Sequence, residues 1–364
     1  MAITKLPGLI DLHVHLRDPG QTNKEDFYTG TCAALAGGYT AIIDMPNNKI
    51  PITTSRKLEE KIKIAKRKIV CDLGFYFGSM GRNIDEFEKV KDKVFGLKLY
   101  LNETTGNFLI KKADLEKIFK SWKSLQTLSL HSDRVYSQKP ILLHAEDSAV
   151  DYVISLVKKT GAKAHFCHIS TASDLKQIIK AKENNLPVTC GVTPHHLFLT
   201  EEDVRTLGPF GQMKPPLRSK KDQNFIWKNL KYVDVVESDH APHTIKEKHK
   251  DPPPFGVPGL ETTLPLLLTA VSQKRLTVAE VIRLCHTNPG RILGIKSDKQ
   301  TYSEVDLNCE FLIRNSNLHT KCGWSPFAGW KIKGKVNKVF IRGKKVFEYG
   351  KVLVKPGFGN IIEP

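Results

Sequence analysis

Short, almost uninterrupted apolar runs recur along the first two thirds of the chain, and they constrain its fold more than any other feature. Because their apolar residues are continuous rather than alternating, they are typical of parallel strands buried on both faces. Eight such runs occur by residue 239, at Leu9–Val14, Thr40–Met45, Ile69–Phe77, Val94–Leu101, Ile141–Leu143, Ala164–Cys167, Val188–Val192 and Val233–Val236.

Segments with helical spacing and charge separate most of these runs, for example Arg56–Lys68, Ala149–Lys159 and Ala172–Glu183. Parallel strands need crossover connections of this kind. Eight strand–helix repeats over roughly 250 residues match the size of a (β/α)8 barrel. A doubly wound open sheet is the alternative, but no glycine-rich phosphate fingerprint opens any of the helices. We therefore predict an α/β fold, a TIM-type barrel.

The pattern changes after Ser303 to short strands with hairpin signals. Asn337–Ile341 and Lys345–Tyr349 flank a turn and form the clearest hairpin. We therefore expect a catalytic barrel over residues 1–300 and a small β-rich extension, packed on the barrel, over residues 301–364.

The chain is strongly basic, with 56 Lys+Arg against 38 Asp+Glu and a formal net charge of +18. Lysine-rich segments such as Lys57–Lys68 and Lys331–Lys345 keep helix or hairpin periodicity and lack interleaved aromatics, so we interpret them as solvated faces, not a nucleic-acid site. No apolar stretch approaches the ~20 residues of a membrane span. Seven scattered cysteines without a C-x-x-C pair are typical of a reducing compartment. We expect a soluble, cytoplasmic protein that binds neither nucleic acid nor membrane.

Polar side chains stand at the ends of five of the expected strands, namely His13 and His15, Lys98, His144, His168 and Asp239. Side chains two apart on a strand share a face, so the first two histidines point the same way. The carboxyl ends of barrel strands converge on one site. One such histidine alone is more often a hydrogen-bonded core residue. Four imidazoles and a carboxylate together predict a metal site, and nitrogen and oxygen ligands without thiolate favour zinc or a similar divalent ion.

Lys98 is unusual because it lies within an apolar run, where a buried ammonium is costly unless it is paired or neutralised. It either reaches the barrel mouth or snorkels outward, or it is converted by carbon dioxide to a carbamate that could bridge two cations. The residues alone leave these interpretations open.

The chain resembles the cyclic amidohydrolases, most closely dihydroorotase of the type found in the multifunctional CAD-type pyrimidine-synthesis protein. The H-x-H pair alone is weak evidence, but the motifs occur in family order through essentially the whole chain. They are Pro7–Gly20, Asp44–Asn47, Gly96–Thr104, Thr193–Leu197, Ser238–His243 and Pro258–Thr262.

This resemblance implies two Zn²⁺ per chain. His13, His15 and Asp239 would hold the first, His144 and His168 the second, with carboxylated Lys98 and a hydroxide bridging both. Asp239 would also be the catalytic residue that takes the hydroxide proton and passes it to the leaving ring nitrogen. The implied reaction is the reversible cyclisation of N-carbamoyl-L-aspartate to L-dihydroorotate in de novo pyrimidine biosynthesis.

The resemblance also implies substrate contacts. Arg17, Asn47 and His243 match residues that hold the substrate carboxylate, for which an arginine offers a bidentate fork. Lys214 is a further candidate contact, altered because animal sequences carry arginine there. Thr104 and Thr105 are candidate lid residues, although the animal type has phenylalanine at the second position.

Cys167 matches a thiol implicated in an extra zinc site in this type, but its companion acid is replaced by Gly191. We therefore expect no third metal and interpret Cys167 as an inert core residue.

Only 12 residues precede His13, whereas freestanding family members usually begin with roughly half of a β-sandwich. We therefore expect a domain of a longer protein, covalently linked to carbamoyl-phosphate synthetase and aspartate transcarbamoylase domains. A homodimer or larger assembly is the family expectation.

Two other functions stay open. Hydantoinases, dihydropyrimidinases and allantoinases share the metal ligands, but the carboxylate-binding segments Arg17–Gly20 and Asp239–His243 favour a dihydroorotase. An inactive dihydroorotase-like scaffold domain would have lost metal ligands, and every ligand position is intact here.

Overall fold

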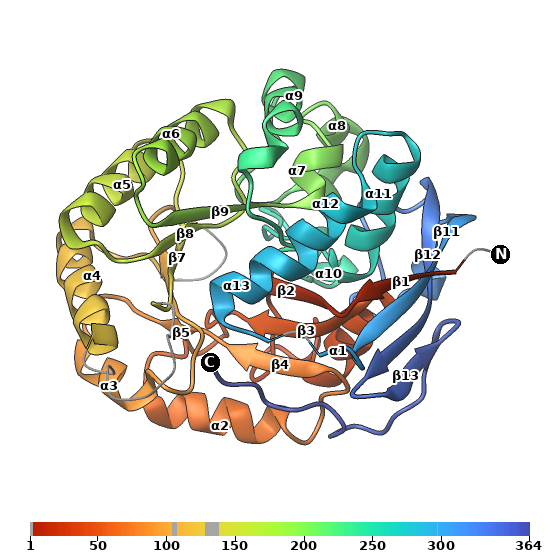
Figure 1. The fold of residues 1–364 in the computed structure, drawn as a ribbon, viewed down its shortest axis with the longest axis horizontal. Coiled ribbons are helices and arrows are strands. Elements are labelled where there is room, and N and C mark those ends of the chain that lie inside the picture. Colours follow the sequence, from red (N-terminus) through yellow and green to blue (C-terminus); the bar gives the residue numbers. More distant parts are fainter. Residues whose placement is uncertain (1–2, 104–107, 128–137, 297) are drawn as a thin grey trace.

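The chain folds into a barrel of parallel strands surrounded by helices in the computed structural model, which describes residues 3–103, 108–127, 138–296 and 298–364 (Figure 1). Each of the eight predicted strands is present, so the predicted (β/α)8 fold is confirmed. The barrel strands are β2 (Leu9–Val14), β3 (Tyr39–Asp44), β4 (Asp72–Phe75) continued by β5 (Phe77–Gly78), β6 (Leu97–Tyr100), β7 (Ile141–His144), β8 (Ala164–Phe166), β9 (Val188–Val192) and β10 (Val235–Val236).

The ring of strands closes between β10 and β2. Neighbouring strands pair in parallel from β2 to β4 and from β5 to β10. Val14 forms a parallel bridge with His240, and the N–H of His15 donates to the carbonyl of His240 at 2.8 Å. The motifs Pro7–Gly20 and Ser238–His243 thereby become neighbours at the mouth of the barrel.

Helices cover the outside of the barrel and begin at side-chain caps. Thr54, Thr171 and Thr277 each accept a backbone N–H of the first turn that follows. The helices are α1 (Phe27–Ala36), α2 (Ser55–Ala65), α3 (Phe87–Val90), α4 (Lys112–Thr127), α5 (Ser148–Thr160), α6 (Ala172–Glu183), α7 (Pro194–Phe198), α8 (Asp203–Leu207), α9 (Lys220–Lys228), α10 (Ile245–Lys248), α11 (Leu260–Ser272), α12 (Val278–Ile282) and α13 (Asn288–Leu293). No helix within the described residues is long and apolar enough to cross a membrane.

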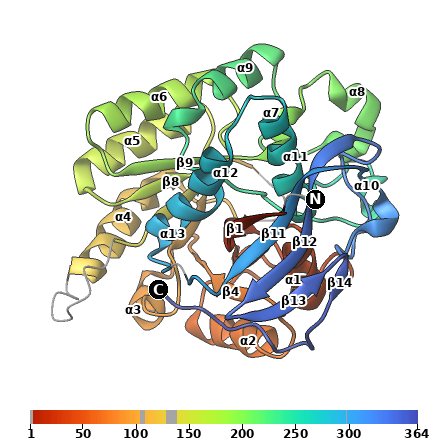
Figure 2. The ribbon, with the colours of Figure 1, turned by 45° about the vertical axis from the view of Figure 1, so that its right-hand side comes forward.

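An antiparallel sheet lies beside the barrel and pairs the N-terminal strand with strands from the last part of the chain (Figure 2). Its order is β1 (Ile3–Pro7), β11 (Tyr302–Leu312), β12 (Lys331–Ile341), β13 (Lys344–Glu348) and β14 (Lys351–Val352). The hairpin expected near the end of the chain is β12–β13, and the sheet packs on α11 and α1. The N-terminal strand β1, which pairs with β11, was not expected from the sequence. The boundary at residue 300 stays a prediction.

Strand β2 departs from simple alternation just before the site. Its register against β3 shifts between Asp11 and Val14. There the Asp11 carboxylate accepts the N–H of His13 at 3.0 Å and also that of Ser238. Leu12 packs inside the barrel with Ile43 and Phe95, while the next residue, His13, already faces the mouth. Because of this irregularity, β2 both contributes Leu12 to the core and places His13 and His15 at the mouth of the barrel.

Candidate metal centre

Side chains from around the barrel converge in one cavity at the carboxyl ends of the strands. Of the ten metal-binding and substrate-binding residues expected from the sequence, eight line it: His13, His15, Arg17, Asn47, His144, His168, Lys214 and Asp239. The other two, Lys98 and His243, are buried next to these residues. Tyr100 and Phe255 complete the wall. Thr104 and Thr105 lie outside the described residues, and the predicted roles of all these residues stay predictions.

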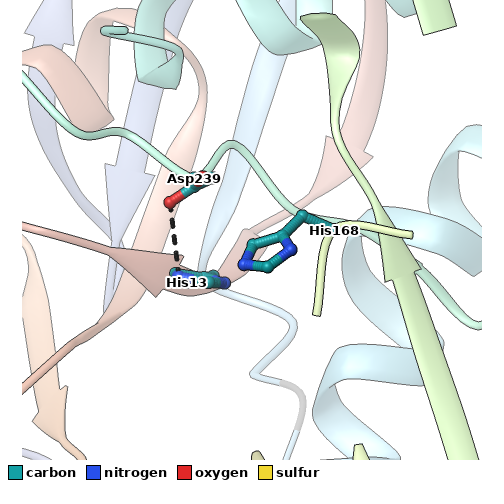
Figure 3. A group of neighbouring side chains, drawn as sticks. All are labelled: His13, His168 and Asp239. Atoms are coloured by element: carbon teal, nitrogen blue, oxygen red, sulfur yellow. Dashed lines mark ion pairs between the residues drawn. The ribbon is translucent and has the colours of Figure 1, made fainter. Parts of the chain in front are cut away.

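His13, His15 and Asp239 form the first group of donor atoms. The Nε2 atoms of the two histidines are 3.2 Å apart, and Oδ1 of Asp239 lies 3.3 Å from the first and 3.1 Å from the second. Figure 3 shows Asp239 reaching His13 from the loop after β10, with the His168 ring beside them. Three donor atoms thus face one point, as ligands around a single cation do.

His144 and His168 form a second group. Nδ1 of His144 is 3.1 Å from Nε2 of His168. The other ring nitrogen of His144 lies 3.2 Å from Oε1 of Glu146, whose second oxygen accepts from Arg218 at 2.8 Å. A carboxylate behind a metal-binding histidine fixes the orientation of its ring.

The histidines are held in the neutral form that binds metals. Burial, followed by the charge of Lys98, lowers the pKa of His13 to about 4. Burial also lowers the pKa values of His15 and His168 well below their usual range. The pKa of Asp239 is raised by burial, against the opposing effect of nearby positive charges.

The residues present fit a divalent cation. Donor atoms of His13, His168 and Asp239 lie within 4.8 Å of one another, and all three side chains are buried. Nδ1 of His168 is a buried polar atom without a hydrogen-bond partner. Neutral imidazoles and a carboxylate, buried together with unused lone pairs, are the chemistry of a metal site rather than of a hydrogen-bonded core.

Lys98 projects from β6 and is fully buried. Its Nζ lies 3.1 Å from Sγ of Cys167 and 5.0 Å from the centre of the Tyr100 ring. Within the described part of the chain, no carboxylate lies at ion-pair distance from this Nζ. The geometry therefore places the amine among the two groups of histidines without a paired anion.

One wall of the cavity carries positive charge. The guanidinium of Arg17 lies 3.3 Å from Nε2 of His243 and donates from Nε to the carbonyl of Pro242 at 3.2 Å. Burial, Arg17 and Lys24 all lower the pKa of His243, which is therefore neutral. Nζ of Lys214 sits 5.1 Å from the Phe255 ring on the same cavity. This wall suits an anionic group of a ligand.

Sequence reasoning missed three charged residues of the site. Glu237, Glu146 and Lys24 each contact a candidate ligand or substrate residue. Glu237 follows an apolar strand directly and precedes the Ser238–His243 motif, and Glu146 stands two residues beyond His144. The position of these two acids, next to a motif or to a histidine at a strand end, is the sequence signal that could have identified them.

Comparison with known proteins agrees with this geometry. The amidohydrolase family model matches residues 4–209, more than half of the chain. A dihydroorotase from Pyrococcus furiosus is 38% identical over 369 residues, covering 98% of this chain and 85% of the relative. The multifunctional protein CAD of Squalus acanthias is 40% identical over 359 residues. This match covers 98% of the present chain but only 16% of the length of the CAD protein.

The solved structure of an L-hydantoinase from Arthrobacter aurescens superposes with a TM-score of 0.90 at 25% identity, covering 98% of this chain and 88% of the hydantoinase. The shared fold and the convergent histidines define the class as cyclic amidohydrolase. The chain belongs to the amidohydrolase family and, within it, to the dihydroorotases.

Proposed function

We propose that this chain interconverts N-carbamoyl-L-aspartate and L-dihydroorotate at a binuclear zinc centre. The observation that carries the proposal is one cavity with two kinds of wall. Five candidate metal ligands line this cavity together with Arg17, whose guanidinium contacts His243. Dihydroorotate has the matching pair of features, a cyclic amide to open and a carboxylate to hold.

His13, His15 and Asp239 would hold the first zinc ion, and His144 and His168 the second. Lys98, once carboxylated, would add a shared anionic ligand between them. When bound, the two ions activate water and polarise the amide carbonyl of the substrate. Among the described residues, no carboxylate pairs with the fully buried Lys98, which supports its conversion from an amine to an anion.

Asp239 is the proton carrier of the proposed reaction. In ring opening, oxygen of water bonds to the amide carbon, the ring carbon–nitrogen bond breaks, and the nitrogen needs a proton. Asp239 lines the cavity beside His13 and His15, where its carboxylate can take the proton of water and deliver it to the nitrogen. Ring closure uses the same steps in reverse.

Arg17, Asn47 and His243 would bind the substrate carboxylate, with Lys214 as a further contact. Asn47 also places Oδ1 2.7 Å from Nδ1 of His15, so it links the substrate wall to a metal ligand. A dihydropyrimidinase or hydantoinase needs no such cationic wall, because its ring substrates lack that carboxylate. The wall therefore favours dihydroorotate over the uncharged rings.

The likeness to a segment of a CAD protein supports a wider setting. In this setting the chain is linked to carbamoyl-phosphate synthetase and aspartate transcarbamoylase domains, assembles as a homodimer or larger, and works in the cytoplasm. An immunoblot of the source cells tests the linkage. A band far larger than the 41.0 kDa of this chain is expected, and a band at that mass would contradict the linkage.

Substrate choice tests the function directly. The zinc-loaded chain is expected to open dihydroorotate, and to open dihydrouracil, which lacks only the carboxylate, at least about 100-fold more slowly, because hydrogen bonds to charged groups are worth about 1.5–3 kcal/mol. Faster turnover of dihydrouracil would favour the dihydropyrimidinase alternative. A chain that binds no zinc would favour the scaffold alternative.

Arg17→Lys provides the matched variant. It keeps the positive charge but loses the planar fork that grips a carboxylate with two hydrogen bonds. We expect kcat/KM for dihydroorotate to fall about 10- to 100-fold, while the already slow turnover of dihydrouracil changes little. An equal loss for both substrates would contradict the carboxylate contact.

A further inference from the structure

Glu237 lies directly beneath the metal-binding residues and has no role in the steps above. It follows β10 and is fully buried. Its Oε1 accepts the backbone N–H of His168. Its Oε2 lies 3.5 Å from Nδ1 of His13 and 3.5 Å from Nε2 of His165. One carboxylate therefore touches a member of each group of candidate zinc ligands.

Three otherwise unpartnered atoms meet at this carboxylate. Nδ1 of His13, Nε2 of His165 and Oε2 of Glu237 are all buried polar atoms without a hydrogen-bond partner at normal distance. Each of these atoms would be costly to bury alone. If the two 3.5 Å contacts to Glu237 Oε2 shorten slightly, they become charge-assisted hydrogen bonds. The Thr189 hydroxyl, 2.8 Å from Nδ1 of His165, can donate to that nitrogen and leave the Nε2 hydrogen for Glu237.

The contact to His13 fixes which nitrogen faces the metal cavity. A hydrogen on Nδ1 would point to Glu237 and leave the lone pair on Nε2, the atom that lies near His15 and Asp239. A carboxylate behind a ligand histidine sets the tautomer and ring orientation in this way.

The contact to His168 holds a strained backbone. His168 has φ of +38°, a left-handed conformation that a non-glycine residue adopts only when its surroundings impose it. The hydrogen bond from its N–H to Glu237 is one such restraint. It keeps the imidazole directed into the cavity.

Gly191 makes room for the carboxylate. A Cβ built on this buried residue of β9 would lie 2.7 Å from Cδ and 2.7 Å from Oε1 of Glu237. Real Cβ contacts do not come that close, so any other residue at 191 would displace the Glu237 side chain. The glycine on β9 and the acid after β10 are therefore one spatial unit, although 46 positions separate them.

We propose that Glu237 is a positioning residue that holds His13 and His168 in their metal-binding orientations, in the space that Gly191 leaves open. This inference rests on the proposed metal centre and adds the residue that orients it. Donor atoms of Glu237, His13 and Cys167 also lie within 4.8 Å of one another. In the proposed role Glu237 orients the ligand histidines and does not itself bind the metal.

Zinc affinity of the full chain, measured by competition with a chelating dye, is the primary test. Glu237→Gln keeps the shape and removes the charge, and we expect zinc binding to weaken about 10- to 100-fold. The absorption bands of the Co²⁺-loaded variant are expected to shift, a response that loss of stability alone does not produce. Glu237→Asp, which keeps the charge, is expected to lose less zinc affinity than Glu237→Gln.

A double-mutant cycle tests the role of Gly191. Gly191→Ala is expected to weaken zinc binding in the native background, because it displaces Glu237. In a Glu237→Ala background the same change has nothing to displace, so we expect it to add less than about twofold. Additive losses would overturn the coupling. Asp234→Asn is the control, because Asp234, like Glu237, accepts a backbone N–H, in its case that of Cys190, but contacts no candidate ligand.

Zinc affinity within twofold of the native chain in the Gln and Asp variants would overturn the proposal. If Glu237→Gln does not fold, as judged by its unfolding midpoint, the Asp variant decides. A native chain that binds zinc but leaves dihydroorotate intact would contradict the proposed function and leave this test valid. A native chain that binds no zinc would overturn both.

Discussion

Three fully buried lysines show how differently one residue type is stabilised in this molecule. Nζ of Lys61 lies 2.7 Å from Oδ2 of Asp44, and Lys248 donates to three backbone carbonyls. Lys98 has a thiol and an aromatic ring beside it instead. Its apolar run made Lys98 conspicuous in the sequence. The buried ion pair between Lys61 and Asp44 could not be predicted, because the lysine lies on α2 and the carboxylate on β3.

The proposed carboxylation of Lys98 would make metal loading depend on carbon dioxide. Metal-free chain mixed with Zn²⁺ in buffer depleted of carbon dioxide is expected to take up less than two ions, and bicarbonate is expected to restore the second. A Lys98→Ala variant should show no response to bicarbonate. Zinc uptake is measured by mass spectrometry of the metal. Equal uptake in both buffers would contradict the carboxylation of Lys98.

Elements buried on both faces were predictable from local sequence, and elements defined by distant partners were not. The barrel strands agree with the apolar runs to within a few residues, because their composition alone reports their burial. Strand β1 was missed because its identity depends on pairing with β11, some 300 positions away. Helix α12 passes into a π-helical segment at Arg283, whose side chain donates to the carbonyls of Val233 and Leu230, far away in the sequence.

Helix α11 carries a half-buried acid, Glu261, that couples stability to pH. Glu261 accepts the N–H groups of His319 and Thr320 at 2.9–3.0 Å, and burial raises its pKa from 4.5 to about 7. Between these pH values the folded chain holds a proton that the unfolded chain releases. The free energy of unfolding therefore falls as pH rises from 4.5 to 7, by about 1–3 kcal/mol.

Urea unfolding of the native chain and Glu261→Gln at pH 5 and pH 7.5 measures this effect. The variant should lose less stability over that interval, because its amide does not titrate. Glu280→Gln, at the exposed first turn of α12, controls for removing a first-turn carboxylate. Identical pH dependence in the native chain and the Glu261 variant would contradict the assignment.

At the scale of the whole molecule, the order of motifs predicted which strand ends meet, because a barrel brings every carboxyl end to one face. In the structure, eight of the residues chosen on this basis line one cavity. It could not reveal the packing of Gly191 against Glu237, because no pattern in the sequence pairs a residue of β9 with the residue that follows β10.

A site assembled from so many strands exists only in the folded chain, so bound zinc should stabilise the whole fold. With free Zn²⁺ at about 100 times Kd, each site adds about 2.7 kcal/mol to the free energy of unfolding. The unfolding midpoint is expected to rise on zinc loading and fall again with a chelator. A His13→Asn variant should respond less. An unchanged midpoint in the native chain would contradict a metal site that spans the barrel.

Ring opening of dihydroorotate by the zinc-loaded chain, beside Asp239→Asn prepared identically, tests the proposed chemistry most directly. We expect turnover by the native chain and a loss of at least 10²–10⁴-fold in the variant, the range for removing a general acid–base group. Zinc content is measured on the same samples, so that loss of a ligand and loss of the proton carrier are separated. Turnover by the zinc-loaded variant equal to that of the native chain would contradict the role of Asp239.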